Sequence, residues 1–96
     1  MIRCVNFRPY PKNTLRGLAD LELTPVGLVL HDCTWHRHAN GKEWISFPAR
    51  SYEDPNGGVS WAPVVEFAAG AKKAHAQFQR QTLEAIHAAA AAENAD

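Results

Sequence analysis

The densest group of reactive side chains is the run His-Asp-Cys-Thr-Trp-His-Arg-His at residues 31–38. Imidazole, thiolate and carboxylate are all transition-metal ligands, so the composition of this run raises the question of a metal site. On a strand, however, His31 and Cys33 would share one face, while Asp32, His36 and His38 would share the other. No face then collects three good ligands close together. We expect solvent-exposed histidines near a turn, and no metal site.

A nucleophilic cysteine is the second chemistry that this run suggests, because an imidazole can activate a thiol. Cys33 has two imidazoles close to it in the sequence, those of His31 and His36. The pattern supplies no orienting third group and no oxyanion donors for either pair. The chain also lacks a Gly-rich phosphate loop, a Gly-x-Ser-x-Gly motif and a His-Glu-x-x-His motif. We therefore expect a protein that is not an enzyme and that binds no cofactor.

Large aromatic side chains fall on successive strand-like segments, at Trp35, Trp44, Phe47, Tyr52 and Trp61. Such residues either fill a core or form a platform on which unpaired bases stack. Trp44 alternates in phase with Ser46, so we expect it to be exposed. Phe47 and Trp35 alternate in phase with apolar residues and are expected to pack inside. The pattern leaves Trp61 unassigned.

Basic residues accompany these aromatics, although the formal net charge of the chain is zero. Residues 1–50 hold seven Lys or Arg against four Asp or Glu, a local charge of +3, and the remainder carries −3. Cations that neutralise phosphates release counterions, so a basic face favours nucleic acid. The candidate nucleic-acid-binding residues are Arg16, Arg37, Lys42, Trp44, Arg50, Lys72 and Lys73.

Two classes of function therefore stay open. Aromatic residues interleaved with basic ones favour binding of nucleic acid, single strands in particular. The alternative is a protein-interaction module that binds a partner chain through an exposed sheet edge or an aromatic face. Salt dependence separates the two, because phosphate contacts lose affinity steeply as salt rises and an apolar interface does not.

The elements that must position these residues are a sheet followed by a helix. Alternation with period two predicts strands over residues 15–23, 26–35, 43–51 and 59–67, which are preceded by a short strand over residues 1–8 and a Pro-containing connector up to residue 13. Asn40-Gly41 and the stretch 54–58 are hairpin turn signals. Pro48 implies either an edge strand or an interrupted ladder. In the strand over residues 15–23, Asp20 is expected on the solvent-facing side.

From about residue 68 the period changes to that of a helix, which we expect to continue to residue 92 before a tail at 93–96. Its apolar stripe is Ala71, Ala74, Phe78, Thr82, Ala85, Ile86 and Ala89. This order of elements predicts an α+β fold, with a small antiparallel sheet of four to five strands and one long C-terminal helix on one face.

The size and composition of the chain add three expectations. Its 96 residues support a single domain whose thin core favours a homodimer. No stretch resembles a secretory signal or a membrane span, so we expect a cytoplasmic protein without a membrane partner. Cys4 and Cys33 lack a Cys-x-x-Cys spacing and are expected to be reduced.

The order of segments resembles that of the SpoVG family of small bacterial proteins over about residues 14–90. The resemblance is carried by Leu-Arg-Gly-Leu-Ala-Asp-Leu-Glu-Leu at 15–23, Leu-Val-Leu-His-Asp-Cys at 28–33, Trp-Ile-Ser-Phe-Pro-Ala-Arg at 44–50 and Ala-Pro-Val at 62–64. Its most specific pieces are His31-Asp32 at the end of an apolar strand and the Phe47-Pro48 step.

Membership of this family would imply a cytosolic homodimer that binds nucleic acid and acts as a regulator. Family members tend to carry basic residues at the start of the final helix, where this chain has Lys72 and Lys73 within different surroundings. The three tryptophans and residues 1–13 also depart from the family pattern and indicate a distant relative.

Overall fold

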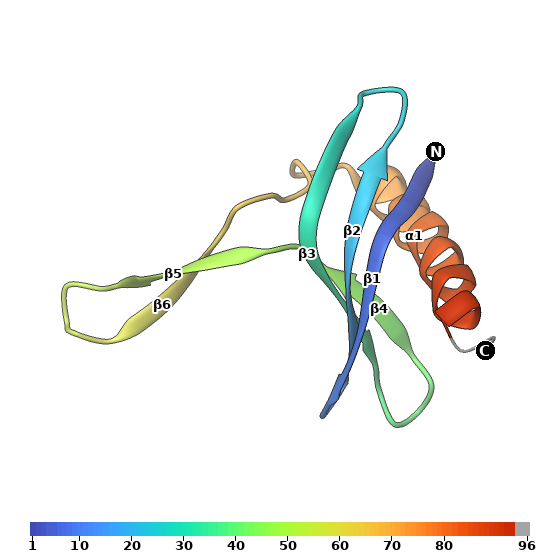
Figure 1. Ribbon diagram of the computed structural model, residues 1–96. Helices are drawn as coiled ribbons and strands as arrows, with labels where there is room; N and C mark the ends of the chain where they lie inside the picture. The colour runs from blue at the N-terminus through green and yellow to red at the C-terminus, as the bar shows by residue number, and fades with distance from the viewer. Residues whose placement is uncertain (94–96) are drawn as a thin grey trace.

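The chain folds into two antiparallel sheets and one helix (Figure 1). The computed structural model describes residues 1–93. Along the chain the elements are β1 (Ile2–Lys12), β2 (Leu15–Leu23), β3 (Leu28–Arg37), β4 (Glu43–Ser46), β5 (Ala49–Glu53), β6 (Val59–Pro63) and α1 (Lys72–Glu93). Four strands form one sheet in the order β1-β2-β3-β4, and β5 pairs with β6. The α+β class is confirmed, and the main sheet has four strands as expected, whereas the separate two-stranded sheet was not predicted.

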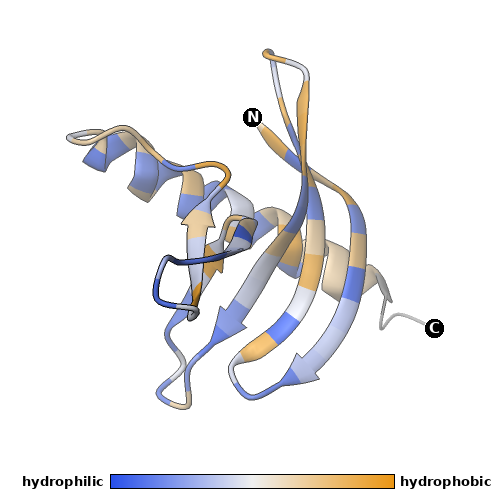
Figure 2. Ribbon diagram, turned by 90° about the vertical axis from the view of Figure 1, so that its left-hand side faces the viewer, coloured by the Kyte–Doolittle hydropathy of each residue, from blue (hydrophilic) through white to orange (hydrophobic). Residues whose placement is uncertain are grey.

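The helix α1 covers one face of the four-stranded sheet, where it packs along β1 and β4. Hydrophobic and hydrophilic residues alternate along the strands in Figure 2, as expected for a sheet with one buried face. From α1, Phe78, Thr82 and Ile86 recur every four residues and are all buried, which confirms the centre of the predicted stripe. The sheet contributes Ala19, Leu21, Cys33, Trp35 and Ile45 to this core. We call the other side of the sheet its outer face.

Several element boundaries differ from the prediction. The strand expected over residues 26–35 is β3 at Leu28–Arg37, shifted by two residues. The strand expected over residues 43–51 is broken, because β4 ends at Ser46 and β5 begins at Ala49, on either side of the Phe47-Pro48 step. Pro48 therefore interrupts the ladder. The helix starts at Lys72 and not near residue 68, since Gly70 has a φ of 88°, in the left-handed region that an α-helix cannot pass.

The ends of the chain show further differences. β1 continues to Lys12 through the stretch that was expected to be a connector, and it tolerates Pro9 and Pro11 because it is an edge strand. The last strand ends at Pro63, four residues earlier than predicted. Helix α1 extends to Glu93, and the rest of the expected tail, residues 94–96, lies outside the described residues.

Both edges of the four-stranded sheet are obstructed. The side-chain amide of Gln79 on α1 accepts a hydrogen bond from the Ile45 N–H at 2.8 Å and donates one to the Ile45 carbonyl at 2.9 Å. It thus takes the place of a neighbouring strand beside β4. On the other edge, the two prolines of β1 remove donors from the ladder. A partner strand would therefore find fewer free backbone groups at Ile45 and at the proline-containing end of β1.

We call β5, β6 and the turn between them (residues 49–63) the arm. Figure 1 shows the arm reaching away from the four-stranded sheet and from α1. Its tip is the expected turn, in which the Asp54 carboxylate accepts hydrogen bonds from the N–H groups of Asn56 and Gly58. An isolated two-stranded hairpin is at best marginally stable in water. Contacts with residues outside its own two strands would therefore stabilise the arm.

Both cysteines are free thiols, with Cys33 buried and Cys4 half-buried. Over the described residues, the single helix is too polar to serve as a membrane span.

Candidate nucleic-acid interface

The turns β1–β2 and β3–β4 lie at the same end of the four-stranded sheet, the lower end in Figure 1. The register explains this arrangement, because Lys12 pairs with Leu15, Leu15 with His36, and His36 with Trp44. A hydrogen bond of 2.8 Å from the Arg37 N–H to the Thr14 carbonyl ties the first turn to the end of β3. Residues that are far apart in the sequence thus form one row across the sheet.

Four cations gather at this end, and we call them, together with His36, His38 and Trp44, the basic end. They are Lys12, Arg16, Arg37 and Lys42. Glu43 is the acid beside them, and it is already engaged. Its carboxylate accepts a 2.7 Å hydrogen bond from the Trp35 indole, lies 2.7 Å from His87 Nε2, and pairs with Arg37 at 3.5 Å.

The protonation of Glu43 follows from these contacts. Burial by itself would raise the pKa of the carboxyl, but hydrogen bonds from His87 and Trp35 outweigh burial and hold the pKa below its usual value. Glu43 is therefore an anion at neutral pH. Because its charge is met by three donors, it offsets the surrounding cations only in part.

An aromatic pair lies on the outer face at this end. The rings of Trp44 and His36 stack with centroids 5.1 Å apart and planes 6° from parallel. Both His36 nitrogens have partners, the hydroxyls of Thr14 and Thr34, each at 3.0 Å. Burial lowers the pKa of His36, so the imidazole is neutral at pH 7. Trp44, expected to be exposed, is half-buried because this imidazole covers part of it.

Next to this pair the surface is hollowed. A cavity of about 470 Å³ is lined by His38, Asn40, Lys42 and Trp44. Its lining combines an indole, an ammonium group, an amide and an imidazole. Such a set can stack on a planar ring, attract an anion and hydrogen-bond a polar edge.

The two arginines of the basic end are partly occupied. The Arg37 guanidinium lies 5.4 Å from the centroid of the Trp35 ring, in a cation–π arrangement on the helix side of the sheet. Arg16 donates hydrogen bonds to the carbonyls of Asn13 and Leu15. Both guanidinium groups keep unused N–H donors, because each has five.

The other three predicted site residues lie elsewhere. Arg50 is exposed on β5 of the arm. Lys72 and Lys73 open α1, whereas His87 on the same helix contacts Glu43 at the basic end. The fifteen residues between Lys72 and His87 span roughly 22 Å of helix. The structure thus unites Arg16, Arg37, Lys42 and Trp44, and it separates Arg50, Lys72 and Lys73 from them.

Four members of the basic end or its hollow were absent from the predicted binding residues, and one of them, His36, had been considered only as a metal ligand or a partner of Cys33. Lys12 lies four residues before Arg16, across the β1–β2 turn, and strand pairing brings it to the same end of the sheet as Lys42. His38 and Asn40 belong to the Asn-Gly turn, which was identified as a turn and not as part of a surface.

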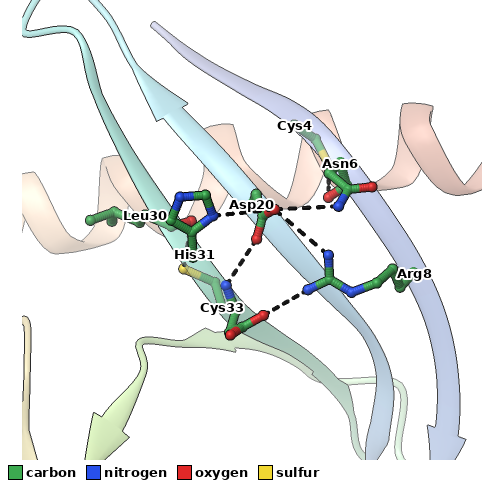
Figure 3. Close-up of polar contacts among 8 residues, drawn as sticks. Cys4, Asn6, Arg8, Asp20, Leu30, His31 and Cys33 are labelled. Atoms are coloured by element: carbon green, nitrogen blue, oxygen red, sulfur yellow. Dashed lines mark hydrogen bonds and ion pairs between the residues drawn. The ribbon is translucent and has the colours of Figure 1, made fainter.

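A second polar cluster lies at the centre of the outer face (Figure 3). The Asp20 carboxylate accepts hydrogen bonds from the Asp32 N–H at 3.0 Å and from the Asn6 amide at 3.3 Å. It also lies 3.3 Å from His31 Nδ1 and 3.6 Å from the Arg8 guanidinium, which pairs with Asp32 at 2.7 Å. Although Asp20 was expected on the wet face, it is only 8% exposed because these side chains cover it.

The cause of this cluster is a pair of bulges. The register shifts in β1 between Cys4 and Asn6, and in β3 opposite Asp20, where Asp32 has a φ of 59°. The bulge in β3 breaks the simple alternation. His31 therefore reaches Asp20 on the outer face while Cys33 is buried under the helix, so the expectation that these two share a face was wrong.

The electrostatics of the cluster point to a structural role. The Asp32 N–H lowers the pKa of Asp20, and hydrogen bonds from His31 and Asn6 add to this effect against the opposing effect of burial. Burial raises the pKa of Cys33 to about 12, with the charges of Asp20 and Asp32 acting in the same direction. Cys33 is thus a neutral thiol at pH 7 and a poor nucleophile. Within residues 1–93, no three metal-binding side chains converge on one point.

Comparisons with known proteins add no relative. No protein-family model matches the chain, and neither a curated protein nor a solved structure matches it. The resemblance to the SpoVG family thus stays a prediction from the residues quoted above.

Proposed function

We propose that this protein is a non-enzymatic nucleic-acid-binding protein of the cytosol that acts as a homodimer and prefers single strands. The observation that carries the proposal is the presence of Lys12, Arg16, Arg37 and Lys42 at the end of the sheet that bears a stacked aromatic pair on its outer face. On the described strands and turns of this end, four cations stand against one acid, a local charge of +3 in a chain that is neutral overall. Phosphates would be attracted to this end first.

Single strands suit the basic end better than a duplex does. The hollow beside Trp44 has room for a planar ring, and a base can stack on an indole only when it is unpaired. The Lys42 ammonium group lines the same hollow and is suited to the phosphate of that nucleotide. The Asn40 amide can donate to or accept from a base edge. Stacking without extensive base readout would give weak sequence preference.

The alternative function, binding of a partner chain, is favoured by one specific observation. The arm exposes Trp61 and Val59 by 69% and 71%. The arm also carries one cation, Arg50, and two acids, Glu53 and Asp54, so its net charge does not attract phosphates. The arm is therefore a candidate protein interface, whereas the basic end is the candidate nucleic-acid interface.

Fluorescence anisotropy with labelled single-stranded and duplex oligonucleotides tests the proposal. We expect tighter binding of the single strand, and Trp44→Ala should weaken it by about 1 to 3 kcal/mol because one stacked base is lost. Trp61→Ala is the matched control, since it removes the same side chain from the arm and should leave unchanged the affinity for an oligonucleotide too short to span two basic ends. Equal losses in both variants, or no binding of either oligonucleotide at low salt, would contradict the proposal. Circular dichroism checks that both variants fold.

A further inference from the structure

Exposed apolar side chains are concentrated on two projections of the molecule. Within the described residues, ten large apolar side chains are exposed, and seven of them lie on the arm, on the segment that follows it or on the β2–β3 hairpin. These seven are Val26, Leu28, Val29, Tyr52, Val59, Trp61 and Val64. An apolar surface of this extent marks an interaction site in a protein of this size.

On the second strand of the arm, three apolar residues share one face. Val59, Trp61 and Pro63 alternate along β6, so their side chains point to the same side. Trp61 pairs with Ser51, whose small side chain leaves the indole uncovered. The arm thus presents a tryptophan supported by two smaller apolar residues.

A matching apolar pocket lies where the arm joins the body. It has a volume of about 280 Å³, and Leu28, Phe47, Phe67 and Phe78 are among the side chains that line it. Phe47 lies two residues before the arm, and Leu28 belongs to the β2–β3 hairpin. Glu66 is the one charged residue of its lining. The pocket is therefore suited to an apolar or aromatic side chain.

The Trp61 of the same chain does not fill this pocket. A hydrogen bond from the Val64 N–H to the Pro48 carbonyl marks the root of the arm, and Trp61 lies three residues further out. Three residues of strand span about 10 Å. The indole is carried away from the pocket and stays 69% exposed.

We infer that two copies of the chain pair by exchanging their arms, so that Trp61 of each copy occupies the apolar pocket of the other. One chain carries both the projecting aromatic side chain and the apolar pocket. A two-fold axis near the roots of the arms satisfies both contacts at once, and this arrangement closes at two copies. It also supplies each arm with the contact that an isolated hairpin lacks.

This pairing rests on the proposed function and describes how its homodimer forms. The residues that pair the two copies are not those of the basic end. The β1–β2 and β3–β4 turns lie at one end of the sheet, and the β2–β3 hairpin beside the pocket lies at the other (Figure 1). The two basic ends therefore stay accessible in the dimer. One strand of nucleic acid that spans both ends would be bound with increased avidity.

Sedimentation velocity of the purified chain at micromolar concentration tests the inference. We expect a dimer, and Trp61→Glu should sediment as a monomer because a carboxylate cannot enter the apolar pocket. Val5→Glu is the control, since Val5 is an exposed apolar residue of β1, away from the arm. It should stay dimeric. A monomeric unmodified chain, or a dimeric Trp61→Glu variant, would overturn the inference.

A cross-link identifies the contact itself. When Trp61→Cys and Leu28→Cys variants, both in a Cys4→Ser background, are mixed under mild oxidation, a disulfide should join positions 61 and 28 of different chains. Peptide mass spectrometry would detect it. Trp61→Cys mixed with Val5→Cys should give far less product, and equal yields would overturn the arm exchange.

The two proposals fail in different ways. A monomeric Trp61→Glu variant that still binds a short oligonucleotide supports both the arm exchange and the basic end. A dimer that binds no nucleic acid would leave the arm exchange in place and reject the proposed function.

Discussion

Asp20 illustrates how one residue can organise the surface around it. Its carboxylate lies opposite a bulge in each neighbouring strand and receives donors from the Asp32 backbone, Asn6, His31 and Arg8. A buried anion with this many partners fixes the strands on either side of it. The cluster is therefore a structural feature of the outer face and not a reactive site.

Asp20→Asn should destabilise the fold by about 1 to 3 kcal/mol at pH 6, because it removes the charge that these donors meet. The folded-state pKa of Asp20 lies below the unfolded value of about 3.9. Its contribution is thus present above that value and is lost as pH falls through the folded pKa. In urea unfolding, the difference between the original chain and the variant should shrink below about pH 4. A difference that is constant down to pH 2 would contradict this account.

Thr82 provides the opposite case, a buried polar atom without a partner. Thr82 is fully buried between α1 and the sheet, and its Oγ1 forms no hydrogen bond. Thr82→Val keeps the shape and removes the unmet hydroxyl, so it should raise the free energy of unfolding by about 1 to 3 kcal/mol. Thr82→Ser is the control that keeps the hydroxyl and loses a methyl group, and it should be less stable than the original chain. A destabilised valine variant would show that the hydroxyl is satisfied.

At the level of single residues, the sequence predicted which side chains are buried better than it predicted which residues they contact. Trp35 is packed as expected, with 7% of its surface exposed, because it lies on the same face of β3 as the buried Cys33. Lys12 and the Asp20 cluster could not be predicted, since both depend on strand pairing and bulges. A bulge at Asp32 has no local signal beyond the tolerance of Asp for positive φ.

At the scale of elements, a close approach of two strands governs the packing of β1 on β2. Gly17 pairs with Pro9, and the Phe7 ring, which contacts Trp35 at 6.0 Å between centroids, lies directly over it. A Cβ on Gly17 would come within 2.7 Å of Phe7 Cε1 and 3.1 Å of the Arg8 carbonyl oxygen. The absence of a side chain at position 17 is thus what allows Phe7 to reach the core.

Gly17→Ala should therefore lower the free energy of unfolding by about 1 to 3 kcal/mol, the usual cost of overpacking. Thermal unfolding followed by circular dichroism measures the effect. Adding Phe7→Leu to Gly17→Ala should recover part of the loss, because the smaller side chain leaves room for the new methyl group. If Gly17→Ala is neutral, the ring does not lie over the glycine.

The strands and the helix were largely predictable because their periodicity is strong. β2 has the predicted bounds, and α1 buries the predicted Phe78, Thr82 and Ile86. The arm was hidden in the same pattern, since residues 43–51 and 59–67 alternate like strands of one sheet. What divides them is Pro48, and alternation alone cannot tell which partner a strand will pair with.

At the scale of the whole molecule, charge and apolar surface are separated. The cations of the basic end lie at one end of the four-stranded sheet, while the exposed apolar residues lie on the arm and around the β2–β3 hairpin (Figure 1). A chain with no net charge can therefore present a cationic surface and an apolar surface at different places in one fold. We propose that the first binds nucleic acid and the second binds another copy of the chain.

The salt dependence of binding to a single-stranded oligonucleotide tests the central claim most directly. Each phosphate neutralised on a single strand contributes about −0.7 to the slope of log K against log salt. Lys12→Ala with Lys42→Ala should therefore make the slope less steep by about 1.4. Lys72→Ala with Lys73→Ala removes the same two charges at the start of α1 and should leave the slope unchanged. If only the second pair reduces the slope, or if the unmodified chain does not bind at low salt, the basic end is not the nucleic-acid site.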